Sequence, residues 1–387
     1  MTEVLVVGGG IGGLAAAYAM RRAGREVRVL EQAAEFGEVG AGLQLAPNAT
    51  RILAEWGLLD AVTATGVLPR RLVLRDALTG AELTHLGVGD DFRRRYRAPY
   101  VVAHRTDLHQ ILLDACRDSG VGLETGRTVQ RVETAGDTAI AYCADGSVHR
   151  GAVVLGVDGL NSVLRGDVVD DEPVNSGFVA YRGTLPMADA AGEVEPDEMV
   201  IWIGPGRHFV QYGLRRGEIL NQVAVFRSPS FAGGGPDWGT PDELDAVFAD
   251  SCDHILKSLT SMWRDRRWPM YDRAPIDRWT NGRMILLGDA AHPMLQYLAQ
   301  GACQAIEDAH ALAAQTTRHT SRTGRVDWPA ALAATERVRA PRAAQVQNAA
   351  RLWGDIWHVD GLTRLIRNEM LTTRDPQDHR RLDWLYG

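Results

Sequence analysis

Cysteine is scarce in this sequence, and the few positions it occupies argue against cross-links. Only four cysteines occur among 387 residues, and they are scattered: Cys116, Cys143, Cys252 and Cys303. None belongs to a CxxC pair, and none stands with histidine at the spacing of a zinc site. We therefore expect a reduced, cytoplasmic protein without structural disulfides or a metal centre.

A hydrophobic run long enough to span a membrane is also lacking. The apolar segment Val4–Ala19 has no basic residue before it, and its centre is interrupted by GGGIGG at Gly8–Gly13. A secretory signal or a membrane helix would not carry that interruption. The sequence predicts a soluble protein with no membrane-spanning segment.

Positive charge is not in excess. Lysine and arginine number 42 against 49 aspartates and glutamates, which gives a net charge of −7 and a pI near 5.9. Surfaces that bind nucleic acid or anionic membranes are basic, so these partners are not expected. Apolar residues make up 45% of the chain, which is typical of an ordinary globular protein with a sizeable core.

The N-terminal segment has the pattern of a dinucleotide-binding βαβ unit. Val4–Val7 and Val27–Leu30 read as buried strands, and a helix ending near Gly24 lies between them. In such a unit Gly8 permits the tight turn, Gly10 lets a pyrophosphate approach the backbone, and Gly13 allows close helix packing. Glu31, at the end of the second strand, would bind the ribose hydroxyls. The unit alone does not choose between NAD and FAD.

Three further segments extend the pattern over the chain. Arg105 and Asp107 open a helix in HRTDLHQILLDAC, and VVLGVDGLNSVLR is a buried strand that ends in Asp158-Gly159. RMILLGDAAHPMLQYLAQGACQAIEDAHAL is a buried strand, then Gly288-Asp289, a loop, and a helix opening near Gly301-Ala302. Read alone, Asp289 could be a helix cap and Asp158-Gly159 an ordinary turn.

Together these motifs resemble the group A flavoprotein aromatic hydroxylases, the p-hydroxybenzoate and salicylate hydroxylase family. The resemblance covers essentially the whole chain. It implies an α/β fold: a Rossmann-like FAD-binding domain of the p-hydroxybenzoate hydroxylase type, an antiparallel-sheet substrate domain and C-terminal helices. It also implies FAD as cofactor, with NADH or NADPH docking transiently as reductant, since no second GxGxxG occurs.

The resemblance assigns the cofactor residues one by one. Asp289 matches a contact to the ribityl and ribose part of FAD, Asp158 a segment associated with FAD and the pyridine nucleotide, and Arg105 the FAD pyrophosphate. The complete set of expected FAD residues is Gly8, Gly10, Gly13, Glu31, Gln44, Arg105, Val129, Asp158, Asp289, Gly301 and Ala302. His292 recurs in the family whatever the substrate, so we interpret it as a packing or flavin-loop residue.

Several longer stretches resemble the 3-hydroxybenzoate 6-hydroxylases within that family. They are FGEVGAGLQLAPNATRILAEWGLLD, GFVAYRGTLP, GRHFVQYGLRRGEILNQVAVF, DRRWPMYDRAPI and LGDAAHPMLQYLAQGA. Most family members have a proline in the loop after the GD motif, whereas Gln296 stands there in this sequence. The 3-hydroxybenzoate enzymes share that glutamine, and salicylate 1-hydroxylases usually keep the proline.

The substrate lobe is predicted over about residues 171–277. MVIWIG, RHFVQYGL and NQVAVF read as antiparallel strands, and RRGE closes a hairpin. A period of two places His208, Val210 and Tyr212 on one face, and Phe209 and Gln211 on the other. A buried structural histidine is the simplest reading of His208 from sequence alone. The resemblance favours a functional one, because His208, Tyr212 and Gln296 match site residues of the related enzymes.

The resemblance implies a specific chemistry. A flavin hydroperoxide would transfer oxygen to an electron-rich ring carbon, most simply carbon 6 of 3-hydroxybenzoate, which is para to the hydroxyl; the product would be 2,5-dihydroxybenzoate (gentisate). His208 would accept or share the phenol proton, and Tyr212 and Gln296 would orient the ring. A salicylate hydroxylase, a tailoring hydroxylase for a larger aromatic, and a flavin-binding regulator without turnover remain open. The absence of WxWxIP disfavours a halogenase.

The expected domain boundaries follow these motifs. We predict an FAD-binding domain over 1–170, with a short substrate-lobe insertion near 70–100, and a substrate-binding sheet domain over 171–277. The FAD-binding domain resumes over 278–328, and helices occupy 329–387. These last helices would close the pocket or form a homodimer interface. Core packing explains Trp353 and Trp357 at least as well.

Overall fold

A parallel sheet forms the centre of one lobe. The computed structural model describes residues 3–37, 40, 42–190, 194–231 and 237–387. Within them a six-stranded sheet has the order β17-β18-β11-β1-β2-β7. Its strands are β17 (Thr280–Asn281), β18 (Met284–Leu286), β11 (Val153–Gly156), β1 (Val4–Val7), β2 (Val27–Leu30) and β7 (Gly122–Glu124). Both strands predicted for the βαβ unit are confirmed, and they pair in parallel.

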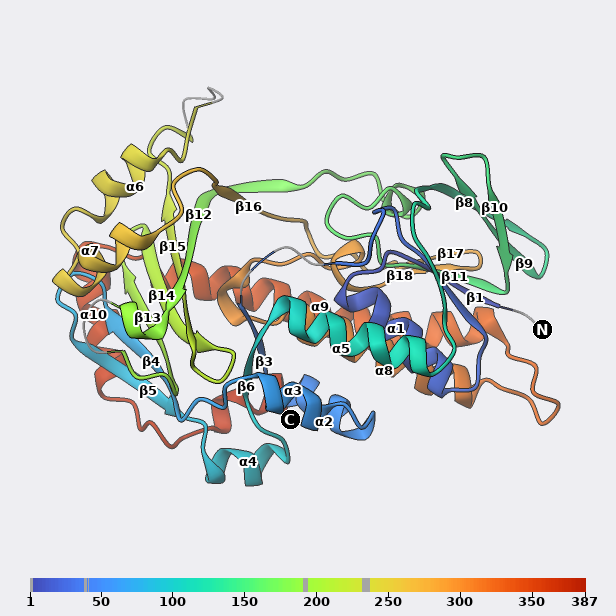
Figure 1. Cartoon of the computed structure of the whole chain (residues 1–387), viewed down its shortest axis with the longest axis horizontal. Helices are drawn as coiled ribbons and strands as arrows, with labels where there is room; N and C mark the ends of the chain where they lie inside the picture. Colours follow the sequence, from blue (N-terminus) through green and yellow to red (C-terminus); the bar gives the residue numbers. More distant parts are fainter. Residues whose placement is uncertain (1–2, 38–39, 41, 191–193, 232–236) are drawn as a thin grey trace.

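Three helices pack beside this sheet (Figure 1). Helix α1 (Ile11–Arg22) lies against both α5 (Arg105–Asp118) and α8 (Gly301–Arg318). A small antiparallel sheet stands at the far end of the lobe, with the order β10-β9-β8. Its strands are β8 (Val129–Ala135), β9 (Thr138–Cys143) and β10 (Val148–Gly151).

The second lobe is built on a seven-stranded sheet with the order β16-β12-β15-β14-β13-β4-β5. Its strands are β4 (Arg71–Asp76), β5 (Glu82–Gly87), β12 (Val174–Pro186), β13 (Glu198–Gly204), β14 (Arg207–Leu214), β15 (Ile219–Arg227) and β16 (Trp268–Asp272). Neighbouring strands are antiparallel except for β13 and β4. The predicted hairpin between β14 and β15 is confirmed, with Arg215 and Arg216 in the left-handed region of its turn.

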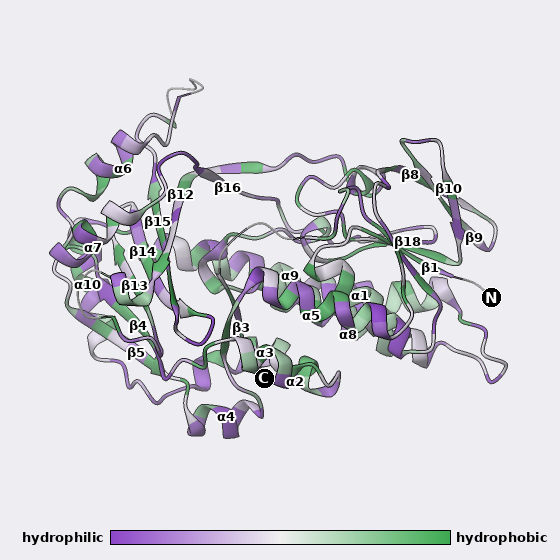
Figure 2. Cartoon of the chain, in the orientation of Figure 1, coloured by the Kyte–Doolittle hydropathy of each residue, from purple (hydrophilic) through white to green (hydrophobic). Residues whose placement is uncertain are grey.

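The two faces of this sheet bury separate cores. One face, with Tyr181, Phe209 and Phe226, packs on α6 (Pro241–Phe248) and α7 (Asp253–Ser258). The other face contributes Val210, Tyr212 and neighbours to a core that is continuous with the first lobe. Figure 2 shows largely apolar strands in both lobes and a polar α4 (Asp90–Tyr96) at the edge.

The pair of strands β3 (Gly42–Leu45) and β6 (Val101–His104) and helix α9 (Trp328–Trp357) are among the elements that connect the two lobes. Strands β3 and β6 pair between the lobes, near α2 (Pro47–Glu55) and α3 (Leu59–Thr65). Helix α9 starts beside β17, where Glu336 Oε2 accepts hydrogen bonds from the backbone N–H groups of Trp279 (2.6 Å) and Thr280 (2.9 Å). It ends beside the second sheet and is followed by α10 (Gly361–Thr372) and α11 (Asp383–Tyr386).

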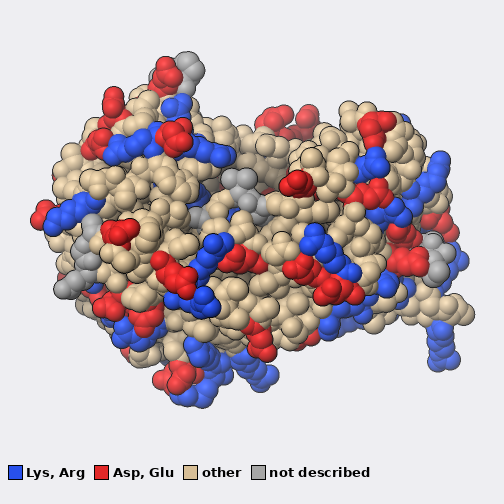
Figure 3. All heavy atoms as spheres, in the orientation of Figure 1, with Lys and Arg blue, Asp and Glu red and all other residues tan. Residues whose placement is uncertain are grey.

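The described part of the chain contains neither a candidate membrane-spanning helix nor a candidate metal-binding cluster. No helix in it is both long and apolar enough to cross a bilayer, and no cluster of three or more ligating side chains that could hold a metal ion occurs there. Acidic and basic side chains are interspersed over the face drawn in Figure 3.

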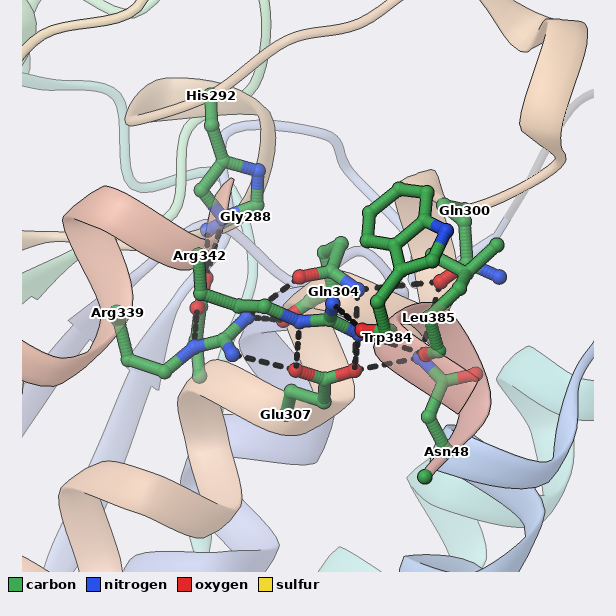
Figure 4. Close-up of polar contacts among 12 residues, drawn as sticks. Asn48, Gly288, His292, Gln300, Gln304, Glu307, Arg339, Arg342, Trp384 and Leu385 are labelled. Carbon is green, nitrogen blue, oxygen red and sulfur yellow. Dashed lines mark hydrogen bonds and ion pairs between the residues drawn. The ribbon is translucent and has the colours of Figure 1, made fainter. Parts of the chain in front are cut away.

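A buried charge network ties α8, α9 and the GD segment together (Figure 4). Asp308 is fully buried, and its carboxylate accepts the backbone N–H of Gly288 (2.9 Å), contacts His292 Nε2 (2.6 Å) and pairs with Arg339 Nε (2.7 Å). Arg339 also pairs with Glu307. His292 is thereby held as a structural residue, which fits the interpretation made from the sequence.

Replacing Arg339 tests how much this network stabilises the fold. We expect Arg339→Met to lower the free energy of unfolding by about 3–5 kcal/mol, because the buried Asp308 loses its guanidinium partner and Glu307 keeps only the more distant Arg342. Arg337→Met is the matched control on the same helix, since Arg337 is exposed, and it should change stability by less than about 0.5 kcal/mol. Urea unfolding monitored by circular dichroism measures both; equal losses would contradict the assignment.

Candidate active site

The glycine loop has the geometry of a phosphate cradle. Gly8 has φ +107°, and a Cβ atom there would clash with the carbonyl of Val157. A Cβ atom at Gly13 would clash with the carbonyl oxygen of Gly8, so α1 can approach the loop only with glycine at this position. Gly10 is the N-cap of α1, whose positive dipole end faces the loop. These constraints fit an FAD pyrophosphate.

Glu31 lies beside the cradle, as the pattern predicts. Its carboxylate accepts the backbone N–H of Gly9 at 2.6 Å and that of Ala33 at 2.7 Å. The buried imidazole of His109, on α5, meets the carbonyl oxygen of Gly9 at 2.9 Å and so holds the loop from its other side. Sequence reasoning missed His109; its one signal was a histidine on the otherwise apolar face of a predicted helix.

The first turn of α8 gathers several of the expected cofactor residues. The helix begins at Gly301, followed by Ala302, and a Cβ atom at Gly301 would lie 3.9 Å from Asp289 Oδ1. The backbone oxygen of Gln44, on β3, accepts a hydrogen bond from Cys303 Sγ at 3.6 Å. An exposed carboxylate beside a glycine-opened helix end suits the sugar and phosphate groups of FAD.

The Asp158 carboxylate accepts hydrogen bonds from the turn that follows it. It accepts the Ser162 hydroxyl at 2.6 Å and the N–H of Val163 at 3.0 Å. A short 3-10 turn over Leu164–Asp167 follows. Within it the buried Arg165 pairs with Asp171 at 2.7 Å and donates to the backbone carbonyls of Ala290 and Ala291, so the DG and GD segments are fastened together.

The two remaining expected FAD residues lie at the ends of elements. Arg105 is the first residue of α5, and a Cβ atom at Gly40 would lie 3.0 Å from its Cδ. Val129 is buried at the start of β8, in the small sheet. Residues 38, 39 and 41, which belong to one of the stretches used for the family resemblance, lie outside the described residues.

The face of the second sheet opposite α6 and α7 carries the expected substrate residues, and we call it the pocket face for that expectation. Directly opposed residues share a face, so the pairing of β14, β15 and β12 defines three rows. These rows are His208–Val225–Ala180, Val210–Val223–Arg182 and Tyr212–Asn221–Thr184. The period of two predicted from the sequence is therefore confirmed. His208 and Tyr212 are four residues apart, roughly 13 Å along the strand.

His208 lies in a buried aromatic cluster. It is 1% exposed, and its Nδ1 is 2.9 Å from His358 Nε2, at the end of α9. The ring centroids of Tyr297 and Trp357 lie 5.5 Å and 5.2 Å from the centroid of the His208 imidazole. Burial, with the nearby His358, lowers the pKa of His208 well below its ordinary value, so the ring is neutral near pH 7. The contact with His358 could not be predicted from sequence.

Tyr212 and Gln296 lie in different surroundings. The Tyr212 ring packs on the backbone of Gly42 in β3. Burial raises the pKa of Tyr212 to about 12, although the charges of Arg182 and Arg105 act in the opposite direction, so its hydroxyl remains a donor. Gln296 is exposed, and it is the neighbouring Tyr297 that packs toward His208.

Comparison with known proteins places the chain in a family. Residues 1–350 match the family described as "FAD binding domain". The chain is 38% identical to 3-hydroxybenzoate 6-hydroxylase of Polaromonas naphthalenivorans (strain CJ2), over 99% of the chain and 95% of that relative. It is 37% identical to 3-amino-4-hydroxybenzoate 2-monooxygenase of Streptomyces cremeus, over 100% of the chain and 95% of the relative.

A solved structure agrees with the fold. A variant of Klebsiella pneumoniae HpxO in complex with FAD superposes with a TM-score of 0.87 at 26% identity, over 100% of this chain and 99% of that one. The glycine cradle, the opening of α8 and the full-length match all converge on one cofactor. The chain belongs to the FAD-binding domain family and is one of its group A FAD-dependent aromatic hydroxylases.

Proposed function

We propose that this enzyme uses NADH or NADPH and O2 to hydroxylate 3-hydroxybenzoate at carbon 6, giving 2,5-dihydroxybenzoate. The observation that carries the proposal is the pocket face of β14, where an imidazole and a phenol flank an aliphatic side chain. That spacing suits a flat ring with a polar substituent toward each end. The identity of 38% with an enzyme named 3-hydroxybenzoate 6-hydroxylase supports the same substrate.

The reaction asks the protein to activate a phenol and to exclude water. When bound, reduced FAD supplies the oxygen atom that it takes from O2. Loss of the phenol proton raises electron density at the carbon para to the hydroxyl, and the neutral His208 can accept or share that proton at its Nε2. His358 fixes the other ring nitrogen of His208. The aromatic cluster around His208 keeps water away.

The remaining expected residues complete the proposal. Tyr212 donates a hydrogen bond to the substrate, and Gln296 helps to orient its ring. The FAD contacts are those assigned above, with Asp289 on the ribityl or ribose hydroxyls and Arg105 at the pyrophosphate. The division into FAD-binding and substrate domains at residues 170, 277 and 328 also belongs to the proposal.

A second candidate substrate is favoured by one comparison. The Streptomyces cremeus relative, named for 3-amino-4-hydroxybenzoate, is almost as similar as the 3-hydroxybenzoate enzyme. Both compounds are phenolic acids, so the same pocket face could bind either. The two candidates differ in the position of the new hydroxyl group.

We also propose a cytoplasmic homodimer. All four cysteines are free thiols, as in reduced compartments. Helix α10 exposes Leu362, Leu365, Ile366 and Met370, an apolar stripe that a second copy of the chain would cover. Sedimentation should give twice the monomer mass, and a monomer at micromolar concentration would overturn the dimer.

Product analysis distinguishes the substrates. Incubated separately with NADH, O2 and 3-hydroxybenzoate, salicylate or 3-amino-4-hydroxybenzoate, the enzyme should convert 3-hydroxybenzoate to 2,5-dihydroxybenzoate with the highest kcat/KM. Chromatography with mass detection identifies each product. Conversion of another substrate alone, with none from 3-hydroxybenzoate, would refute the proposed substrate and leave the reaction class intact.

Removing the proposed base should uncouple the enzyme. We expect His208→Ala to lower hydroxylation about 100-fold while NADH is still oxidised, because the phenol is no longer activated and peroxide is released instead. Product and hydrogen peroxide formed per NADH measure this. His254→Ala is the control, since His254 contacts Gln211 on the opposite face of the sheet. Coupled turnover unchanged in the His208 variant would exclude the role.

The GD carboxylate should determine how firmly FAD is held. Asp289→Ala should weaken FAD binding about 10- to 100-fold, the usual loss for a charged hydrogen-bond partner. Flavin released on gel filtration, and the Kd from fluorescence quenching of added FAD, measure the change. Asp277→Ala, which removes an exposed carboxylate before β17, should bind FAD normally. Equal affinities in the two variants would show that Asp289 does not contact FAD.

A further inference from the structure

One end of the pocket face holds polar groups to which the proposed reaction assigns no role. Asn221 stands directly opposite Tyr212 on one side and Thr184 on the other. It is 0% exposed, and neither its Nδ2 nor its Oδ1 has a hydrogen-bond partner among the described residues. A buried amide left without partners destabilises the folded state. Such a loss of stability points to a partner supplied from outside the chain.

Arg182 brings a positive charge to the same end. It lies in the next row of the pocket face, on β12, and its guanidinium stands over the Trp268 ring with Cζ 5.7 Å from the ring centroid. No carboxylate among the described residues pairs with it. Its charge acts on the Tyr212 hydroxyl, and burial together with the charge of Arg105 lowers the pKa of Arg182. A guanidinium remains protonated all the same.

The opposite face of the same strands shows the contrast. There Gln211 donates to Ser258 at 3.1 Å and accepts from His254 at 2.7 Å, and Gln222 accepts from Ser261 at 2.9 Å. Both polar atoms of the Gln211 amide therefore have partners on α7, and Gln222 has one for its Oε1, although its Nε2 has none among the described residues. Asn221, one residue from Gln222, has none in the described chain. The opposite face is covered by α6 and α7, whereas Asn221 lies on the face that carries His208 and Tyr212.

We propose that Arg182 and Asn221, with Tyr212, form the subsite that binds the carboxylate of the aromatic acid. The guanidinium, the amide Nδ2 and the phenol hydroxyl are all donors, and a carboxylate only accepts. His208 lies four residues before Tyr212 on β14, at the other end of the pocket face, so the acid is oriented with its hydroxyl toward the imidazole. This inference rests on the proposed function for the choice of a phenolic acid, and it names the residues that make the pocket specific for an anion.

Binding of matched acids and amides to the FAD-loaded enzyme tests the subsite. Flavin absorbance titrations give the Kd of 3-hydroxybenzoate, 3-hydroxybenzamide, benzoate and benzamide. The unmodified enzyme should bind each acid at least about 10-fold more tightly than its amide. Arg182→Met should raise the Kd of the acids about 10- to 100-fold and Asn221→Leu about 2- to 10-fold, while the amides change little. Gln222→Leu, on the opposite face, should keep the preference for acids.

Thermal unfolding separates binding from a structural role. Asn221→Leu replaces an amide without partners by an apolar group of similar size, so its melting temperature should equal or exceed that of the unmodified enzyme. A lower melting temperature with loss of flavin would make Asn221 structural and overturn its part. Parallel losses of acid and amide binding in the Arg182 variant would overturn the charge recognition.

The outcome for this subsite is distinguishable from that of the proposed function. If benzoate is preferred over benzamide through Arg182 but 3-hydroxybenzoate is not hydroxylated, the subsite stands and the proposed substrate fails. If 3-hydroxybenzoate is converted to 2,5-dihydroxybenzoate and the variants keep the preference for acids, the substrate stands and the subsite fails.

Discussion

The buried carboxylate of Asp308 is the interaction on which the cofactor side of the molecule depends. It joins three segments, since it binds the Gly288 backbone, His292 and Arg339 of α9. Burial alone would raise the pKa of Asp308, but the charges of His292 and Arg339 outweigh it and hold the pKa below its ordinary value. The folded state therefore gains stability above about pH 4 and loses it as the pH falls further.

Much of the fold could be predicted because it follows from local sequence patterns. The strands Val4–Val7 and Val27–Leu30 and the hairpin turn at Arg215 follow from apolar runs and turn residues. The alternation that places His208 and Tyr212 on one face is equally local, since successive residues of a strand point to opposite sides. The family resemblance added FAD and the order of the motifs.

What could not be predicted depends on contacts between distant residues. The pairing of His208 with His358 joins residues 150 positions apart, and no periodicity signals it. His109 touches the glycine loop only because α5 packs on α1. The sequence pattern marks Asn221 only as a strand residue, and it does not show that both polar atoms of its side chain lack partners among the described residues. The link from Arg165 to the carbonyls of Ala290 and Ala291 likewise joins residues more than 100 positions apart.

Helix α9 connects the two lobes, so its length fixes the distance between its contacts in each lobe. Its 30 residues span about 45 Å. Glu336, in its first third, is fixed to β17, and His358, just after its last residue, lies beside His208. Each residue of an α-helix turns the chain by about 100°. Inserting one residue after Glu336 would therefore swing His358 around the axis and away from the imidazole it holds. The number of residues between Glu336 and His358 therefore determines where the imidazole of His358 stands relative to His208.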